Sequence, residues 1–307
     1  MRKKSDHSKR DRLARRNTMN DLDRARAYYA EELRAVANLQ SEVLVKAFAK
    51  VPREHFLGPG PWQVFSPGSE INWTTKDADP RHLYHNLLVV IDSERHLNNG
   101  YPSFLAFLID ELQLQLGERV VHIGCGTGYY TAIMAEVVGS KGHVTAIEID
   151  SGLAGRAHSS LSYLSHVEVF EGDGGEKDPK SCDAVFVNAG ATHPRSIWLD
   201  SLRPDGRLLM PLTVTDDTNP GGAGRFLKVI RQPEGFTASF VSGVRIFPCA
   251  GGRDSELNQR LKEAFSRGDS KSVQSLRRDA HEATDTCWLH AENFCLSKLV
   301  VPLEAPV

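Results

Sequence analysis

The chain of 307 residues lacks any run of eighteen apolar residues, so no transmembrane helix is expected. It also lacks a surplus of either charge, because 37 Lys and Arg stand against 39 Asp and Glu and the formal net charge is −2. Without a global basic field, nucleic acid is not an expected partner. The N-terminus has no apolar core of the kind that marks a secretory signal. These absences favour a cytoplasmic protein.

Cysteine is scarce, and its number is odd. The five cysteines, at positions 125, 182, 249, 287 and 295, are not spaced from one another like the ligands of a metal ion. They indicate reduced thiols of a cytoplasmic protein rather than a disulfide framework. The cysteines therefore predict no metal site.

One segment has a strong charge bias. Met1 to Arg16 holds eight Lys or Arg, two Asp and almost no apolar residue. This composition predicts a disordered, solvated basic tail over residues 1–18. An arm that touches an anionic partner is the alternative interpretation.

The most informative segment is an apolar run that leads into three alternate glycines. Val120–Ile123 predicts a strand. Gly124, Gly126 and Gly128 predict a loop that lets a ligand approach the backbone, and the residues after them predict a helix. A second apolar run then reaches Glu148, twenty residues after Gly128. This order is typical of a unit that binds a nucleoside-containing cofactor, with an acid placed for the ribose.

The spacing of the glycines decides between cofactors. In a dinucleotide fingerprint the fifth position after the first glycine is Gly or Ala, and here it is Tyr129, which argues against NAD and FAD. No Gly-Lys-Ser/Thr follows, which excludes a P-loop. The pattern instead resembles the first motif of class I methyltransferases that use S-adenosyl-L-methionine. The resemblance implies that the loop, with Cys125, passes beneath the methionyl part and that Glu148 takes the ribose hydroxyls.

Three later segments fit the same family in order. His166–Phe170 alternates like a strand and runs into Asp173 and Gly174, where the resemblance implies an acid that meets the adenine amino group. Cys182–Val187 predicts a buried parallel strand that ends at Asn188, at the sheet edge where ligands bind. Leu202–Pro211 predicts a turn into another apolar strand. The predicted cofactor-binding residues are Gly124, Cys125, Gly126, Gly128, Tyr129, Glu148, Asp173, Gly174 and Asn188.

The predicted fold is α/β: a doubly wound, mostly parallel, seven-stranded Rossmann-like methyltransferase sheet with N-terminal helices and a C-terminal α+β extension. The predicted divisions are the tail 1–18, a helical and substrate-site segment 19–102, a cofactor-binding domain 103–250 and an extension 251–307. Towards the C-terminus we expect a flexible loop (216–224), two antiparallel edge strands (226–230 and 240–247), a helix (254–265) and a late strand pair (288–290 and 294–296). Packing or oligomerisation, as in a homodimer, is the expected role of the extension.

The segment before the glycine loop narrows the family. It contains Val-Pro-Arg-Glu-His-Phe at 51–56, a segment centred on Tyr84 and a polar turn with Pro102, and Pro194 follows later. Together these features resemble protein-L-isoaspartate O-methyltransferases over about residues 20 to 215. That family carries a Gly-Gln-Thr-Ile-Ser type segment just before the proline, with the serine at the substrate site. Here His96 to Tyr101 take its place, and the position of the serine falls on Gly100.

The resemblance implies methyl transfer to a carboxylate, which is ionised at neutral pH and needs no general base. Asn98 and Asn99 are the candidate catalytic residues, because two amides in a tight turn can hold a carboxylate or a peptide backbone. A plain Asn-Asn-Gly turn that tolerates positive φ is an equally weighted alternative. Cys125 and His122 are interpreted as buried core residues. Trp62 and Trp73 either line an acceptor pocket or close a small core.

The expected acceptor is a carboxylate on a peptide or protein, and relatives that act on peptide natural products leave a dedicated modified peptide open. O- or N-methylation of a small-molecule metabolite is the second hypothesis. A cofactor-binding protein with little catalysis is the third. Binding of S-adenosyl-L-methionine and release of S-adenosylhomocysteine distinguish the three.

Overall fold

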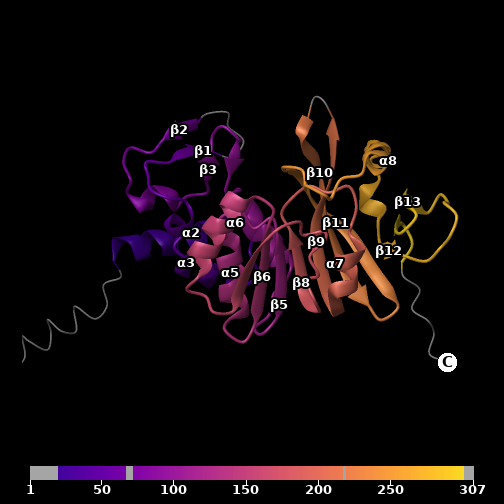
Figure 1. Ribbon diagram of the computed structural model, residues 1–307, viewed down its shortest axis with the longest axis horizontal. Helices are drawn as coiled ribbons and strands as arrows, with labels where there is room; N and C mark the ends of the chain where they lie inside the picture. The colour runs from indigo at the N-terminus through magenta and orange to yellow at the C-terminus, as the bar shows by residue number, and fades with distance from the viewer. Residues whose placement is uncertain (1–19, 67–71, 217–218, 301–307) are drawn as a thin grey trace, which may run out of the picture. The chain divides into compact units, whose positions relative to one another are not determined.

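The computed structural model describes residues 20–66, 72–216 and 219–300, and they form two compact units that divide after Phe104 (Figure 1). The predicted basic tail, residues 1–18, lies outside the described residues. Within the described part of the chain, no helix is long and apolar enough to cross a membrane.

The first unit begins with two helices whose ends are set by polar caps. Helix α2 (Asp21–Ala37) starts where Asn20 accepts a hydrogen bond from the backbone N–H of Asp23. Helix α3 (Glu42–Lys50) starts after Ser41, whose hydroxyl accepts from the N–H of Leu44 at 3.2 Å and caps the helix. The helices bury apolar residues such as Tyr29 and Phe48.

A small antiparallel sheet completes this unit, in the order β2-β1-β3-β4. Its strands are β1 (Gln63–Phe65), β2 (Asn72–Thr74), β3 (Leu88–Asp92) and β4 (Leu97–Asn98), with short 3-10 helices η1 (Arg53–Phe56) and η2 (Pro80–Leu83). Trp62 is buried with Val64, Leu83 and Val89 in a small core, whereas Trp73 on β2 is 42% exposed. Of the two alternatives for these tryptophans, closing a core holds for Trp62.

A buried arginine organises the loop between η2 and β3. Arg53 is fully buried, and its guanidinium donates to the carbonyl oxygens of Leu83 at 2.7 Å, Leu87 at 2.6 Å and His85 at 3.2 Å. It also donates to Oδ1 of Asn99 at 3.2 Å. The fixed fork of five N–H donors suits this task, because one side chain can satisfy several carbonyls that the turn leaves unpaired.

The second unit is built on a ten-stranded sheet in the order β13-β14-β12-β11-β10-β9-β8-β5-β6-β7 (Figure 1). The neighbouring strands from β9 to β7 pair in parallel, and those from β9 to β13 pair antiparallel. The strands are β5 (Arg119–Ile123), β6 (His143–Glu148), β7 (Val167–Glu171), β8 (Cys182–Val187), β9 (Leu202–Asp216), β10 (Asn219–Gln232), β11 (Gly235–Arg245), β12 (Ser275–Arg277), β13 (Cys287–His290) and β14 (Cys295–Ser297). The helices are α4 (Pro102–Glu111), α5 (Tyr129–Val138), α6 (Ser151–Leu161), α7 (Ser196–Ser201) and α8 (Ser255–Ser266), with η3 at Ser270–Ser272.

The α/β fold class is confirmed, but the sheet is larger than the expected seven strands. The late strand pair exists as the antiparallel hairpin β13–β14, and through β12 it extends the same sheet. The prediction that β10 and β11 are edge strands is wrong, because each has a neighbouring strand on both sides. Hydrophobic patterning shows that a strand is half-buried, but it cannot show which strand is outermost.

The predicted flexible loop over residues 216–224 is also wrong for its described residues. Strand β9 runs to Asp216 and β10 starts at Asn219, with residues 217 and 218 outside the description. The register shifts between Asn219 and Ala223, and Gly222 has a φ of 72°. Glycine and proline here mark an irregularity in a long hairpin, which composition alone does not distinguish from a loop.

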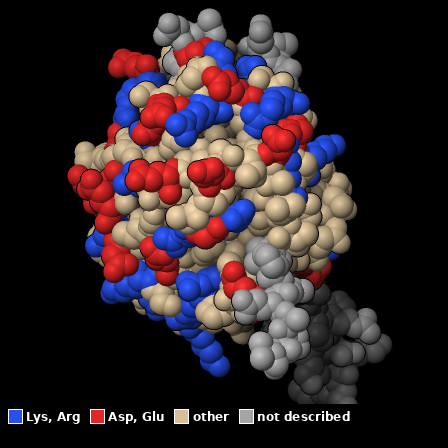
Figure 2. All heavy atoms as spheres, turned by 90° about the vertical axis from the view of Figure 1, so that its right-hand side faces the viewer, with Lys and Arg blue, Asp and Glu red and all other residues tan. Residues whose placement is uncertain are grey.

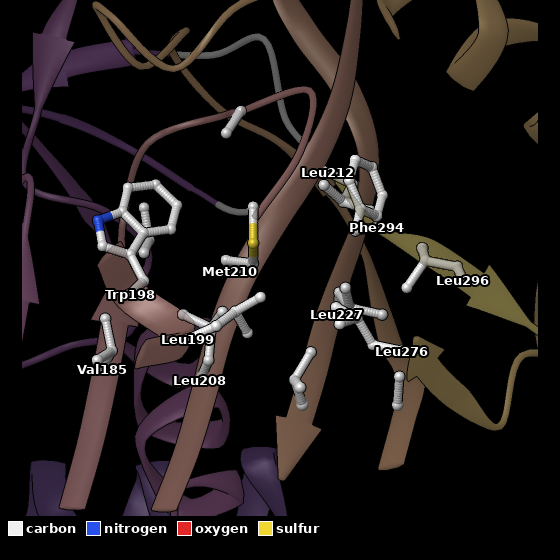
Figure 3. Packing of buried hydrophobic residues seen from close by; sticks show 14 of the residues in the cluster. Val185, Trp198, Leu199, Leu208, Met210, Leu212, Leu227, Leu276, Phe294 and Leu296 are labelled. Atoms are coloured by element: carbon white, nitrogen blue, oxygen red, sulfur yellow. The ribbon is translucent and has the colours of Figure 1, made fainter. Parts of the chain in front are cut away.

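One apolar cluster joins both halves of this sheet. Trp198 on α7 is fully buried against β-strand residues such as Val185 and Met210 (Figure 3). The same cluster continues to Leu276 and Phe294 in the C-terminal part (Figure 3). The extension therefore shares the core of the cofactor-binding sheet.

On the surface, charges of both signs are mixed. Figure 2 shows Lys and Arg interspersed with Asp and Glu over the described residues of one face. That face therefore carries no large field of a single sign.

Candidate functional site

The order of the parallel strands creates a switch point between β5 and β8. The chain runs from β5 through β6 to β7 on one side, and from β8 to β9 on the other. In open α/β sheets ligands bind outside the carboxyl ends of the strands at such a point. The predicted cofactor residues lie at or just after the carboxyl ends of β5, β6, β7 and β8. Backbone hydrogen bonds tie their loops together, from Gly172 to Glu148 at 2.9 Å and from Asn188 to Ile123 at 2.8 Å.

Each of the three loop glycines has a positive φ: 74° at Gly124, 58° at Gly126 and 93° at Gly128. A Cβ at Gly124 would lie 3.3 Å from the carbonyl oxygen of Asn188, and one at Gly128 would lie 2.8 Å from Leu161. At Gly126 nothing lies within 4 Å of that position. The loop therefore has a bare backbone surface at Gly126, where a ligand can lie against it.

The Glu148 carboxylate is held beside this surface. Its Oε2 accepts from the N–H of Gly126 at 2.7 Å, and its Oε1 accepts from the N–H of Asp150 at 3.1 Å. The residue is 7% exposed. An ionised carboxylate offers about four lone-pair sites, so each oxygen retains capacity for a ligand hydroxyl. This arrangement fits a pair of ribose hydroxyls.

Asp173 and Gly174 lie at the end of β7, in a closely packed turn. Oδ1 of Asp173 accepts from the N–H of Gly175 at 2.7 Å, and a Cβ on Gly251 would lie 1.9 Å from Oδ2. A Cβ on Gly174 would lie 2.4 Å from Ile123. Glycine at positions 174 and 251 lets the backbone pass close to the side chains of Ile123 and Asp173. The segment around Gly251, far along the sequence, thus lies against the predicted adenine acid.

The remaining sequence candidates in this loop are buried. Tyr129 begins α5 and is 2% exposed, and Cys125 is 5% exposed. Burial, together with the neighbouring Glu148 carboxylate, raises the pKa of the Cys125 thiol, which keeps it protonated and agrees with a small core residue. Burial lowers the pKa of His122 to about 3, and its Nδ1 lies 2.8 Å from the Thr131 hydroxyl. His122 is therefore a hydrogen-bonded core histidine, as predicted.

Asn98 and Asn99 lie in the first unit, where they differ from each other. Asn98 lines a cavity of about 410 Å³ with residues that include His96 and Tyr101, and its Oδ1 accepts from the N–H of Gly100 at 2.9 Å. Asn99 is 8% exposed, and its Oδ1 accepts from Arg53 and from the N–H of Val89, both at 3.2 Å. Its Nδ2 is buried without a hydrogen-bond partner. The positive φ of this turn falls on His96 and Gly100, not on the asparagines.

A second cavity, of about 590 Å³, lies in the second unit near the end of β8. Its lining includes His193, Arg195, Asp254 and the residues 291–294. The sequence does not show that residues 291–294 of the C-terminal extension form a wall of this cavity.

The switch-point site, the bare glycine loop and the Glu148 carboxylate fit a class I methyltransferase that uses S-adenosyl-L-methionine. Comparison with known proteins specifies the family. The profile described as protein-L-isoaspartate(D-aspartate) O-methyltransferase matches residues 76–220. This chain belongs to the protein-L-isoaspartate O-methyltransferase family.

Individual relatives support the assignment. The chain is 32% identical over 215 residues to the protein-L-isoaspartate O-methyltransferase of Ignicoccus hospitalis, a match that covers 68% of this chain and 90% of that protein. It is 29% identical over 180 residues to the enzyme of Thermotoga maritima, covering 57% of this chain but only 51% of that longer protein. A solved Plasmodium falciparum structure in complex with S-adenosyl-L-homocysteine has the same fold, with a TM-score of 0.55 at 16% identity, over 73% of this chain and 97% of that one.

The loop glycines give a direct test of the cofactor site. Gly128→Ala should lower the stability by about 1–3 kcal/mol, because a side chain at positive φ is strained and the new Cβ meets Leu161. Affinity for S-adenosyl-L-methionine should fall with it, as measured by calorimetry. Gly155→Ala on α6 is the matched control, since its Cβ meets nothing within 4 Å and alanine favours a helix. Equal melting temperatures and affinities for the two variants would disprove the argument.

Proposed function

We propose that this chain transfers the methyl group of S-adenosyl-L-methionine to a carboxylate on a peptide or protein, with an isoaspartyl residue as the first acceptor to test. The observation that carries the proposal is the Glu148 carboxylate fixed against Gly126 beside a bare loop, in a chain of this family. The bound cofactor supplies an electrophilic methyl group on a sulfonium. The protein's own contribution is to align the acceptor and exclude water.

No general base is required by this chemistry, because the acceptor carboxylate is already ionised. What the acceptor needs is hydrogen-bond donors that hold it, and the amides of Asn98 and Asn99 are our candidates. Asn98 faces the cavity in the first unit, and the Nδ2 of Asn99 is a buried donor without a partner. The serine that the family carries at its substrate site would be strained at position 100, since the backbone of Gly100 has a φ of 75°. This difference favours a peptide acceptor held by amides rather than by a hydroxyl.

The acceptor proposal is tested by release of S-adenosylhomocysteine with an isoaspartyl peptide and with the matched peptide that contains normal aspartate. We expect product with the isoaspartyl peptide alone. Tight binding of the cofactor without product from either peptide would reject the repair activity. Turnover of a small carboxylic acid or amine instead would favour the metabolite hypothesis. The five cysteines form no disulfide, which agrees with the cytoplasm as the proposed location.

The asparagine variants test the acceptor site separately. Asn98→Ala should lower kcat/KM about tenfold or more and leave affinity for S-adenosyl-L-methionine unchanged, because Asn98 belongs to the first unit and its Oδ1 accepts from the N–H of Gly100 in the same turn. Asn99→Ala should lower turnover as well, with an added loss of stability because Arg53 and Val89 lose an acceptor. Gln40→Ala on the exposed surface of the same unit is the control. Unchanged turnover in Asn98→Ala would remove this residue from the site.

A further inference from the structure

Four side chains with metal-ligating atoms meet at the outer end of the large sheet. They are His281, Cys287, His290 and Cys295, and their ligand atoms all lie within 4.8 Å of one another. Cys287 and His290 are the first and last residues of β13, and Cys295 begins β14 directly opposite His290. His281 comes from the loop that precedes β13. None of these residues belongs to the cofactor site.

An irregularity in the strand pair explains how they share one face. In a regular strand Cys287 and His290, three positions apart, would point to opposite faces of the sheet. The register of β13 against β14 shifts between Cys287 and Leu289, so one extra residue is inserted. Such a bulge shifts the alternation of side chains between the two faces of the sheet by one residue, so both side chains lie on the same face. Trp288 meanwhile points into the apolar core, where it is 1% exposed.

The donor set is that of a structural zinc site. Two thiolates and two imidazoles are a common tetrahedral set, with Zn–S near 2.3 Å and Zn–N near 2.0–2.1 Å. Such bond lengths place the donor atoms about 3.3–3.8 Å apart. Sγ of Cys287 and Nε2 of His281 lie 3.6 Å apart. The spacing His-x5-Cys-x2-His-x4-Cys is compact, with the bulged hairpin as its frame.

Neighbouring groups orient these side chains as they do around metals. Nδ1 of His281 lies 2.9 Å from the carbonyl oxygen of Asp279, which makes this nitrogen the donor and leaves the Nε2 lone pair facing Cys287. The N–H of Thr284 donates to Sγ of Cys287 at 3.4 Å. Nδ1 of His290 is buried without a hydrogen-bond partner. An uncompensated buried nitrogen is unfavourable, and a cation in the cluster would compensate it.

We propose that His281, Cys287, His290 and Cys295 bind one zinc ion that fastens the C-terminal extension. The strands here are only three or four residues long, so pairing alone gives them little stability. The four residues between His290 and Cys295 line the 590 Å³ cavity, and Phe294 among them packs in the core cluster (Figure 3). The ion would therefore also fix one wall of that cavity.

The sequence contained this site, but the prediction of no metal considered the cysteines only. Cys287 and Cys295 are eight positions apart, which is too far for the usual paired-cysteine motif. His290 lies between them and His281 precedes them, so the sequence offers the ligand types of a zinc site, but only the register shift in β13 brings the four side chains together.

The test is the zinc content of the full-length protein, produced with added zinc and purified with a thiol reductant. We expect one zinc per chain by mass spectrometry of the elements, and the visible bands of tetrahedral cobalt–thiolate coordination after replacement by Co²⁺. His281→Ala and Cys287→Ala, which change two of the three half-buried members of the cluster, should lose the metal. Hydrogen exchange over residues 278–298 should rise in both.

Matched controls are Cys182→Ala, a buried thiol outside the cluster, and His158→Ala, an exposed histidine on α6. Both should keep one zinc per chain. The proposal is overturned if the parent protein holds no zinc under these conditions, or if His281→Ala and Cys287→Ala hold as much as the controls. A disulfide between Cys287 and Cys295 in the reduced, zinc-supplied protein would overturn it as well.

Discussion

Glu148→Gln should weaken binding of S-adenosyl-L-methionine by about ten- to a hundredfold. Two backbone N–H groups, of Gly126 and Asp150, point at the two carboxylate oxygens. In glutamine one of these oxygens becomes an NH₂ group, so a donor faces a donor and the side chain must turn away. Hydrogen bonds to a charged acceptor contribute about 1.5–3 kcal/mol each, and loss of one accounts for the expected change. Calorimetric titration measures it.

The control for this prediction is Glu168→Gln on the neighbouring strand β7. Glu168 is 60% exposed at its side chain and pairs with His143 at 3.5 Å on the surface, where an ion pair contributes little. Its affinity for the cofactor should match that of the parent protein. If Glu148→Gln also binds normally, the carboxylate does not hold the ribose and the glycine loop must be interpreted anew.

Arg53→Met should lower the free energy of unfolding of the first unit by about 3–4 kcal/mol. Methionine fills a similar space and removes a buried charge, but it has no donor for the carbonyl oxygens of Leu83, His85 and Leu87. These carbonyls belong to the backbone and stay buried, so their desolvation is not compensated. Denaturant unfolding, with hydrogen exchange of residues 83–99, measures the loss.

Arg24→Met is the matched control, because Arg24 is 56% exposed and forms an ion pair with Asp21 on the surface of α2. Its stability should stay close to that of the parent protein. Equal unfolding curves for both variants would show that the loop after η2 does not depend on Arg53. Binding of S-adenosyl-L-methionine, which the second unit provides, should survive in both.

The parts of the site that could be predicted are those set by local backbone geometry. The alternate glycines at 124, 126 and 128 have positive φ, and the apolar run before Glu148 ends at the sheet edge. A residue's backbone region and its place at the end of a strand depend on near neighbours in the sequence. The cofactor could therefore be assigned before any contact was known.

The contacts of Asn99 could not be predicted from the sequence. In the sequence it was one of two equivalent amides in a turn, whereas in the structure its oxygen holds Arg53, forty-six positions earlier. The approach of Gly251 to Asp173 is likewise invisible in the sequence. Both contacts depend on how distant segments pack.

The sequence by itself determined the α/β class, the methyl-donor loop and the family of this protein, because these follow from periodicity, glycine placement and the order of motifs along the chain. Only the tertiary structure decided that the extension continues the same sheet and that His281, Cys287, His290 and Cys295 meet. The physical reason is that strand register and a single bulge turn side chains from one face to the other. No composition or spacing rule specifies such a shift.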